Sequence, residues 1–387
     1  MKIVQSVSGK FHHFHLARQL FQRGMLEKIF SSYPRRKLQG EGIPANLLKT
    51  FAPVHMLSLG NMRYGFKQQA IVEQIAHWDR LTFDRFVARH LPECDVFIGL
   101  SGSALITGCK ARRRGAVFVC DRGSSHIRFA DTILRQEFQQ WDQIFFGIDP
   151  RNIALEEQEY AAADLITVPS EFVLRSFITM GVPAEKIRKV PYGADLSRFS
   201  KVADPDPERF DVLFVGQVSF RKGIPYLLEA FERLRHPKKK LTIVGGVLPE
   251  MATFLQRKAF SGVEFVGQLP HLRLKEVMSR SHVLVLPSLE EGLAMVQGEA
   301  MACGCPVIAS ENTGAEDLFK NGQEGFIVPV RDPKSITEHL EMLAQNPAQR
   351  DKMSEQCLRR VTEIGGWNTY GLDYVTVLEA VLSRKCL

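Results

Sequence analysis

Short apolar runs alternate with longer amphipathic stretches along most of the chain, and this alternation restricts its fold more than any other feature of the sequence. In the first 200 residues, the runs that look like buried strands lie at 3–7, 28–31, 96–99, 116–120 and 165–169. The patterns typical of helices lie between them, at 12–23, 69–90, 104–114, 127–140 and 171–180. Strands and helices that alternate in this way predict parallel sheets covered by helices.

The same alternation restarts in the second half of the chain. Two prolines and two aspartates interrupt the periodicity at residues 200–207, where we place an interdomain linker. After it, strands are expected at 210–215, 241–244, 263–266, 282–287 and 306–309, and helices at 225–235, 249–258, 272–280, 293–303 and 332–344. We therefore predict an α/β protein with domains at 1–200 and 201–366, the first completed by a C-terminal helix at 367–387. Open parallel sheets bind ligands at the carboxyl ends of their strands, so two facing sheets would form an interdomain cleft.

The charge is divided unevenly between these two domains. The chain has 387 residues and a net charge of +7, and residues 1–200 contain 27 Lys and Arg against 19 Asp and Glu. The remaining residues contain 23 against 24. A basic first domain suits an anionic partner such as a phospholipid surface, a lipid pyrophosphate or a phosphorylated acceptor, and a solvated basic face is the open alternative. Nucleic acid is not expected, because the basic runs lack interleaved aromatic residues.

The cysteines and the apolar runs indicate a cytoplasmic chain. The seven cysteines are odd in number and form no Cys-x-x-Cys pair, which favours free thiols in a reducing compartment. The longest apolar runs fall far below the ~20 residues that cross a bilayer, and no signal-peptide pattern precedes the first strand. We expect a cytoplasmic protein, with peripheral contact to the inner face of the membrane as a further hypothesis.

Two glutamates occupy the most informative stretch, residues 286–309. The stretch predicts a strand, a loop, a helix that begins near Gly292, a glycine turn and a second strand, with Glu291 at the mouth of the helix and Glu299 about two turns inside it. A helix N-terminus suits a pyrophosphate. A carboxylate at the mouth can accept hydrogen bonds from sugar hydroxyls, and a deeper one from a ribose diol. On spacing alone, a solvated glutamate inside a helix remains the commoner interpretation.

Glu291 and Glu299, with the Ala-Met-Ala-Cys-Gly-x-Pro-Val-Ile that follows, resemble the Glu-x7-Glu signature of retaining glycosyltransferases of family 4. Residues 214–223 are similar to the phosphate-binding loop of that family, and residues 163–170 with 190–199 are similar to its segment leading out of the first domain. The resemblance implies the GT-B fold, in which two Rossmann-like domains face a cleft. The first domain would bind the acceptor and the second the nucleotide-sugar donor.

The resemblance also implies roles for individual residues. Glu291 would contact the transferred sugar and Glu299 the ribose, while Lys222 would bind the diphosphate and stabilise its developing charge. The remaining residues expected at the donor site are Arg221, Gly9, Gly216, Gly292 and Leu293. One position departs from the family pattern: Gln217 stands where an arginine is usual, so either Arg221 compensates or phosphate binding is weaker.

Histidines of the first domain are further candidates for functional residues. His126 follows a predicted strand, and a histidine at a similar place in the family reaches the donor sugar, so His126 is expected to be catalytic. His12, His13 and His15 also lie close in sequence. His12 and His15 share a helix face but have no third ligand at suitable spacing, so acceptor contact or packing is preferred to a metal site.

The predicted function is therefore that of a retaining glycosyltransferase without metal or cofactor. It would move a hexosyl unit from a nucleotide-diphosphate sugar to an acceptor hydroxyl on a glycan, a glycolipid or a lipid-linked precursor. The alternatives are a sugar-nucleotide epimerase of the same fold and a catalytically silent subunit that binds sugar nucleotides.

Overall fold

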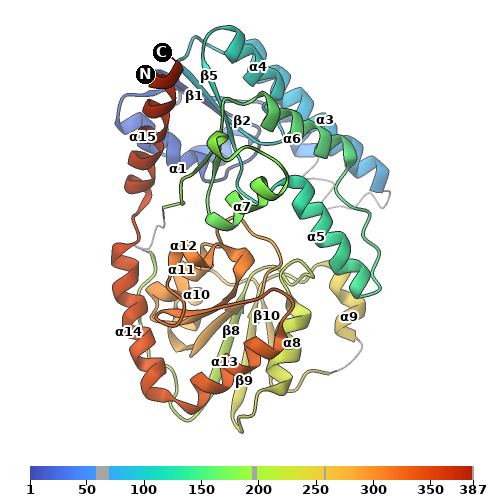
Figure 1. Cartoon of the computed structure of the whole chain (residues 1–387), viewed down its shortest axis with the longest axis vertical. Coiled ribbons are helices and arrows are strands. Elements are labelled where there is room, and N and C mark those ends of the chain that lie inside the picture. Colours follow the sequence, from blue (N-terminus) through green and yellow to red (C-terminus); the bar gives the residue numbers. More distant parts are fainter. Residues whose placement is uncertain (58–68, 194–197, 257–258, 386–387) are drawn as a thin grey trace.

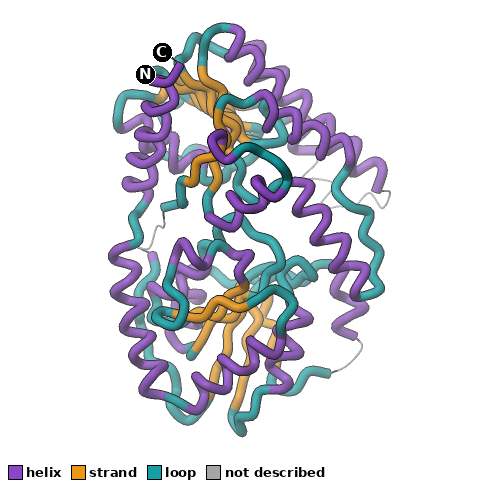
Figure 2. Tube along the Cα trace, viewed as in Figure 1, coloured by secondary structure: helices purple, strands orange, loops and turns teal. Residues whose placement is uncertain are grey.

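The protein consists of two α/β halves stacked along its long axis (Figure 1). A computed structural model describes residues 1–57, 69–193, 198–256 and 259–385. The strands form two separate groups, one in each half, and helices surround both groups (Figure 2). This arrangement is the GT-B fold, so the predicted fold class is confirmed.

The first half contains a seven-stranded parallel sheet of order β3-β2-β1-β4-β5-β6-β7. Its strands are β1 (Ile3–Val7), β2 (Leu26–Ser31), β3 (Leu48–Thr50), β4 (Val96–Leu100), β5 (Val117–Asp121), β6 (Leu165–Val168) and β7 (Ile187–Lys189). The helices around it are α1 (His13–Gln22), α3 (Gln69–His90), α4 (Leu105–Arg113), α5 (Ile127–Gln140), α6 (Pro150–Ala162) and α7 (Glu171–Thr179), with short 3-10 turns η1 (Arg35–Leu38) and η2 (Ala184–Lys186).

The second half contains a six-stranded parallel sheet of order β10-β9-β8-β11-β12-β13. Its strands are β8 (Phe210–Val215), β9 (Lys239–Val244), β10 (Val263–Gly267), β11 (Val283–Leu286), β12 (Val307–Ser310) and β13 (Gly325–Val328). The helices are α8 (Ile224–Arg233), α9 (Ala252–Gln256), α10 (His271–Arg280), α11 (Val296–Ala302), α12 (Ala315–Leu318), α13 (Pro333–Gln345) and α14 (Pro347–Glu363), with 3-10 turns η4 (Pro249–Met251) and η5 (Glu311–Thr313).

In both sheets the strand order reverses at the first strand, β1 or β8, and this reversal positions the site. The chain steps outward from β1 to β2 and β3 and then returns to β4 on the other side of β1, and β8, β9, β10 and β11 repeat this path. Loops on either side of such a switch point diverge and leave a crevice at the carboxyl ends of the strands. The central strands β1, β5 and β11 are buried along their whole length. Parallel strands covered on both faces consist largely of apolar residues.

The last helix, α15 (Trp367–Lys385), returns to the first half and packs against α1. Helix α14 runs along the second half and α15 along the first, so the end of the chain lies near its beginning (Figure 1). Tyr370 and Tyr374 of α15 are fully buried in the same core as Phe14 and Leu20 of α1. Helix α15 therefore contributes core side chains to the first half.

The structure differs from the sequence-based expectations in a few elements. The unpredicted strands are β3, β7 and β13, which lie at sheet edges and are only three or four residues long, and the unpredicted α-helices are α6, α12 and α14. The predicted start of the helix at 293–303 was wrong, because α11 begins at Val296 and Gly292 lies in the preceding loop. Residues 58–68 lie outside the described ranges, as do residues 257–258 of the helix expected at 249–258.

Within the described ranges, no helix combines the length and apolar composition needed to cross a bilayer. Six of the seven cysteines are described and all six are free thiols. Cys303 and Cys305 are completely buried, and burial raises the pKa of the Cys303 thiol to about 11. These two residues are therefore core residues, as their apolar surroundings in the sequence indicate.

The contact between α15 and α1 depends on Gly371, which gives a first testable prediction. A Cβ atom at position 371 would lie 2.5 Å from Cβ of Gln19, closer than such atoms approach in proteins. We expect Gly371→Ala to lower the free energy of unfolding by about 1–3 kcal/mol through overpacking, measured by urea denaturation. The control is Leu372→Ala, since Leu372 is half exposed on the same helix. Equal stability of the two variants would contradict this packing.

Candidate active site

The carboxyl ends of the two sheets meet through direct hydrogen bonds between the halves. Glu290, in the loop after β11, accepts hydrogen bonds from the backbone N–H of Ser125 at 3.0 Å and from its hydroxyl at 2.8 Å. Ser170, which caps α7, donates to the backbone carbonyl of Gly292 at 2.6 Å. These bonds are buried, so the two loops that carry the predicted site residues are fixed against each other.

Gly292 and Gly123 form the closest approach between the halves. A Cβ atom at Gly292 would lie 1.8 Å from the carbonyl oxygen of Gly123, so this position has no room for a side chain. The sequence analysis expected Gly292 at the start of a helix, in contact with the donor phosphate. The structure places it instead in a loop against the opposite half, where the absence of a side chain permits the two loops to meet.

Two adjoining hollows open beside this contact. The first, which we call the His12 hollow, has a volume of about 550 Å³ and is lined by Lys10, Phe11, His12, His15, Arg80, Leu100, Ser101, Arg122, Gly123, Ser124, Glu156, Tyr192, Leu293, Met295 and Trp367. The second, the Glu299 hollow, has a volume of about 540 Å³ and shares Lys10, His15, Met295 and Trp367 with the first. Both receive side chains from both halves of the chain. Together they form a cleft large enough for a small ligand.

Glu291 lies in a strongly basic environment. Its carboxylate forms an ion pair with the Lys222 ammonium, and Nη1 of Arg221 lies 3.4 Å from its second oxygen. Burial alone would raise the pKa of Glu291, but the charges of Lys222 and Arg221 hold it below its usual value. The structure thus brings together three of the predicted residues, Glu291, Lys222 and Arg221. The Arg221 guanidinium also donates to the backbone carbonyl of Glu290 at 2.7 Å, so it is already engaged by the acidic loop.

Glu299 has the opposite electrostatic environment. It lies in the first turn of α11 and lines the Glu299 hollow. Burial raises the pKa of Glu299 to about 7. A carboxyl group that is desolvated without a compensating cation and faces a hollow is typical of a binding site rather than of a structural ion pair.

The glycine loops after β1 and β8 are close-packed. The N–H of Gly9 donates to the Ser32 hydroxyl at 2.9 Å, and its carbonyl accepts from the Ser31 hydroxyl at 2.7 Å. The N–H of Gly216 donates to the carbonyl of Val244 at 2.9 Å. In this conformation, the backbone N–H groups of both glycines therefore have protein partners. Gln217 is exposed next to Gly216.

His126 does not line either hollow. It is the N-cap of α5, where its Nδ1 accepts a hydrogen bond from the N–H of Arg128, and its ring packs against Tyr160 and Phe177. Burial lowers the pKa of His126 to about 4, so the ring is neutral. The residues of this loop that reach the His12 hollow are Gly123 and Ser124. Leu293, by contrast, is buried and forms part of the wall of the His12 hollow.

Several polar residues of the cleft had no assigned role in the sequence analysis. Arg122 donates to Glu156 at 2.5 Å from one wall of the His12 hollow. Asp121, the last residue of β5, approaches His12 and His13, and the three could hold a metal ion, since their ligand atoms lie within 4.8 Å of one another. A polar residue directly after an apolar strand is the sequence signal that could have identified Asp121 and Arg122.

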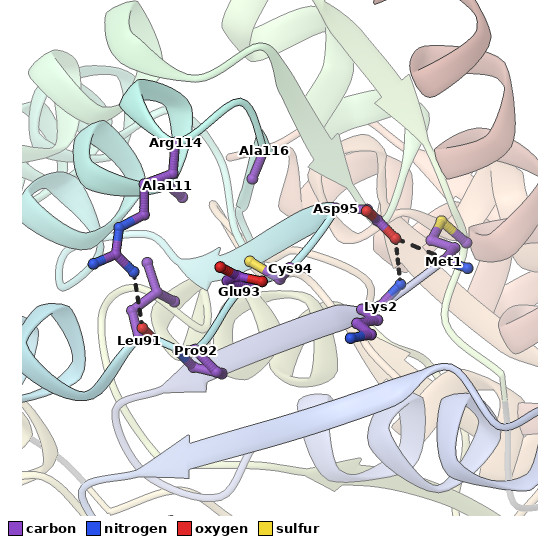
Figure 3. Close-up of a pocket in the computed structure, with 10 residues that line it drawn as sticks. All are labelled: Met1, Lys2, Leu91, Pro92, Glu93, Cys94, Asp95, Ala111, Arg114 and Ala116. Atoms are coloured by element: carbon purple, nitrogen blue, oxygen red, sulfur yellow. Dashed lines mark hydrogen bonds and ion pairs between the residues drawn. The ribbon is translucent and has the colours of Figure 1, made fainter.

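A larger hollow, of about 770 Å³, lies at the opposite end of the first sheet (Figure 3). It surrounds the amino ends of β1 and β4, where Asp95 accepts a hydrogen bond from the backbone N–H of Lys2 at 2.6 Å. Ligands of open α/β sheets bind at the carboxyl ends of the strands. We therefore assign the functional site to the two hollows of the cleft despite their smaller volume.

The chain resembles known families and structures. Residues 197–360 match the model of the family described as glycosyl transferases group 1, which supports membership of this family for the second half of the chain. The match includes Lys222, Glu291 and Glu299, and ends before α15.

Individual proteins extend the comparison. The chain is 27% identical over 230 residues to glycogen synthase of Mycobacterium tuberculosis, covering 56% of each chain. It is 28% identical over 226 residues to the amylovoran biosynthesis glycosyltransferase AmsK of Erwinia amylovora, covering 53% of this chain and 55% of AmsK. The matched segment thus spans about half the length of these relatives. The structure of Anabaena HepE in complex with UDP and glucose covers 98% of this chain and all of that one, with a TM-score of 0.71 at 16% identity.

The buried pair of Lys222 and Glu291 yields a prediction about stability. Lys222→Met would leave the buried Glu291 carboxylate with only the more distant Arg221, so we expect the free energy of unfolding to fall by about 3 kcal/mol. The double variant Lys222→Met/Glu291→Leu should recover part of this loss, because it removes the uncompensated charge.

Urea denaturation would measure both variants. Lys334→Met is the matched control, because Lys334 forms an exposed ion pair with Glu338 and its removal should change stability by less than about 0.5 kcal/mol. A single variant as stable as the control would show that Lys222 does not compensate the charge of Glu291.

Proposed function

We propose that the chain is a retaining glycosyltransferase that moves a hexosyl unit from a nucleotide-diphosphate sugar to an acceptor hydroxyl. The observation that carries the proposal is the pair of glutamates, eight residues apart, with opposite electrostatic environments. Glu291 is held ionised by Lys222 and Arg221, and Glu299 is desolvated at the wall of a hollow. Both lie in the segment that matches glycosyl transferases group 1.

Each glutamate suits a different part of a nucleotide sugar. The ionised Glu291 would accept hydrogen bonds from hydroxyls of the transferred sugar, and Glu299 would accept them from the ribose diol. Lys222 would bind the diphosphate and stabilise the charge that develops as it leaves. The ammonium then changes partners, from the Glu291 carboxylate to the diphosphate. The chemistry requires no metal and no cofactor, because the leaving group meets a fixed cation of the protein.

The acceptor side of the proposal rests on the first half of the chain. We infer that the His12 hollow receives the acceptor, a glycan, a glycolipid or a lipid-linked precursor, because its wall comes mainly from the first half. The names of the relatives support a polysaccharide pathway, since glycogen and amylovoran are both polymers of sugars. The excess of positive charge in residues 1–200 would favour an acceptor or a membrane surface that carries negative charge.

The pKa of Glu299 predicts how donor binding depends on pH. A protonated carboxyl loses acceptor capacity, so the affinity for a nucleotide sugar should rise as pH increases through about 7 and then level off above it. Glu299→Gln should bind about tenfold more weakly above pH 8, because a hydrogen bond to a charged group contributes ~1.5–3 kcal/mol, and it should lack this pH dependence.

Calorimetric titration with UDP-glucose between pH 5.5 and 8.5 would measure this effect. UDP-glucose is the first probe because HepE binds UDP and glucose, and its diphosphate diester does not itself titrate in this range. Identical pH profiles for the wild type and Glu299→Gln would rule out a contact between Glu299 and the donor.

The stereochemical course of the reaction is tested by proton NMR. UDP-, GDP- and ADP-glucose are first compared by thermal shift, and the one that raises the melting temperature most is incubated with the protein in water. Slow transfer to water should release glucose initially as the α anomer, the configuration of the donor. Initial release of the β anomer would refute retention, and release of a nucleotide sugar epimer would favour an epimerase.

A further inference from the structure

Positive charge exceeds negative charge at the wall of the His12 hollow. Of the described residues that line it, Lys10, Arg80 and Arg122 are cationic, whereas Glu156 alone is acidic. The donor chemistry proposed above uses none of these four residues. A hollow lined by one sign of charge attracts ligands of the opposite sign. The partners of each cation therefore decide whether any positive charge is left for a ligand.

Lys10 and Arg122 each have an acidic partner. Nζ of Lys10 lies 2.5 Å from Oε1 of Glu41, which lines the adjoining hollow. Nη1 of Arg122 donates to Oε2 of Glu156 at 2.5 Å, and its Nε donates to the backbone carbonyl of Ser125 at 3.1 Å. Only 14% of the Arg122 side chain is exposed. The charges of these two residues are therefore balanced within the protein.

Glu156 does not also balance the charge of Arg80. Besides the bond from Arg122, Oε2 of this carboxylate accepts hydrogen bonds from the Tyr160 hydroxyl at 2.7 Å and from the Ser101 hydroxyl at 2.8 Å. Its other oxygen, Oε1, lies 3.7 Å from Nη1 of Arg80, which is longer than a hydrogen bond. One carboxylate thus faces two guanidiniums and is held by the nearer one, so one positive charge is in excess.

Arg80, on α3, is the cation with unused donors. Within the described part of the chain it donates no hydrogen bond, and its buried Nη1 has no hydrogen-bond partner. Buried N–H groups are nearly always paired with protein, water or ligand. The guanidinium lies against Gly102, where a Cβ atom would lie 3.1 Å from Nη1. The Arg80 side chain is 33% exposed and lines the hollow, so a ligand there can reach it.

An arginine in this position suits an acidic group. Its planar fork of N–H donors matches the oxygens of a phosphate or a carboxylate and can bind two of them at once. Glu156 is only 4% exposed, so its charge is directed at its own donors rather than at the hollow. Ser124 lines the same hollow and offers a further hydroxyl donor. A neutral ligand would leave the excess charge of Arg80 unbalanced.

We propose that Arg80 binds an acidic group, a phosphate or a carboxylate, carried by the sugar that accepts the transferred hexose. The contact selects acidic acceptors, because a neutral acceptor of the same shape leaves the guanidinium unpaired. The acidic group stays attached to the acceptor and takes no part in the making or breaking of bonds. The inference rests on the proposed function, since it takes the His12 hollow as the acceptor site, but it does not depend on the stereochemistry of transfer.

Titration with simple sugars tests the class of ligand, because it does not require the natural acceptor. The whole chain is first saturated with UDP, the nucleotide present in a HepE complex, so that the diphosphate-binding residues of the donor site are occupied. Glucose-6-phosphate, glucuronate and glucose are then titrated in a calorimeter. We expect at least one of the two acidic sugars to bind about tenfold more tightly than glucose. The tighter of the two identifies the acidic group as a phosphate or a carboxylate.

Substitution of Arg80 tests the residue itself. Arg80→Met should weaken binding of the tighter acidic sugar about tenfold, the usual effect of losing a hydrogen bond to a charged group, and should leave the affinities for glucose and UDP unchanged. Arg80→Lys keeps the charge but not the planar fork, so it should recover part of the loss. The matched control is Arg85→Met, which removes the same charge from an exposed site on the same helix and should bind as the wild type does. Circular dichroism confirms that each variant is folded.

The possible results separate this inference from the proposed function. Equal affinity for glucose and both acidic sugars, undetectable binding of all three at millimolar concentration, or unchanged affinity in Arg80→Met would overturn the inference. Equal weakening by Arg80→Met and Arg85→Met would show only an effect of net charge and would also overturn it. Wild-type protein that binds neither UDP nor any of the three nucleotide glucoses would overturn the proposed function. The titration without UDP would then still decide whether Arg80 binds an acidic group.

Discussion

The buried contact between the loops after β5 and β11 is the constraint on which the cleft depends. Each sheet alone offers only a row of loops at its carboxyl edge. The hydrogen bonds of Glu290 to Ser125, and the close approach of Gly292 to Gly123, hold these two rows face to face. Glu290 is 5% exposed, so its carboxylate must keep these partners to offset its desolvation. The halves can therefore separate only if water or another donor replaces Ser125.

The structure also favours different protonation states at different titratable groups. On the side of the second half, Lys222 and Arg221 keep Glu291 ionised, whereas Glu299 has an environment that favours its neutral form. On the side of the first half, Asp121 is ionised and His13 is neutral. Groups whose pKa values are displaced in opposite directions can act as acceptors and donors of protons at one pH. The same fold thus maintains distinct protonation states in its two halves.

Much of the fold could be predicted from the sequence because its strands are buried on both faces. The run of β11 is apolar throughout and those of β1 and β8 are mainly apolar, and parallel packing is the arrangement that uses such runs. The edge strands β3 and β7 were not predicted, because they are three residues long and include exposed or half-buried positions. Helix α11 was predicted three residues too long at its start, since Leu293 and Ala294 are apolar but are buried by contacts outside a helix.

How much of the candidate site the sequence can indicate depends on how far apart its residues lie along the chain. Glu291, Glu299 and Lys222 were proposed because the short segments that contain them resemble a known signature, and the structure places Lys222 against Glu291. The pairing of Glu290 with Ser125 joins residues 165 positions apart, and that of His12 with Asp121 joins residues 109 positions apart. Their proximity results from the packing of whole strands and helices. His126 shows the converse: its place after a strand was correctly predicted, but its ring turns into the core to cap α5.

The return of α15 to the first half has a consequence for biosynthesis. Tyr374 is bonded to Thr167, and the α15 side chains complete a core that begins with β1 and α1. Domains generally fold in order as the ribosome releases them. Here the first half would emerge with one side of its core uncovered and would wait through translation of the entire second half before its last helix arrived. The core of the amino-terminal half can therefore be completed only after α15 has been synthesised.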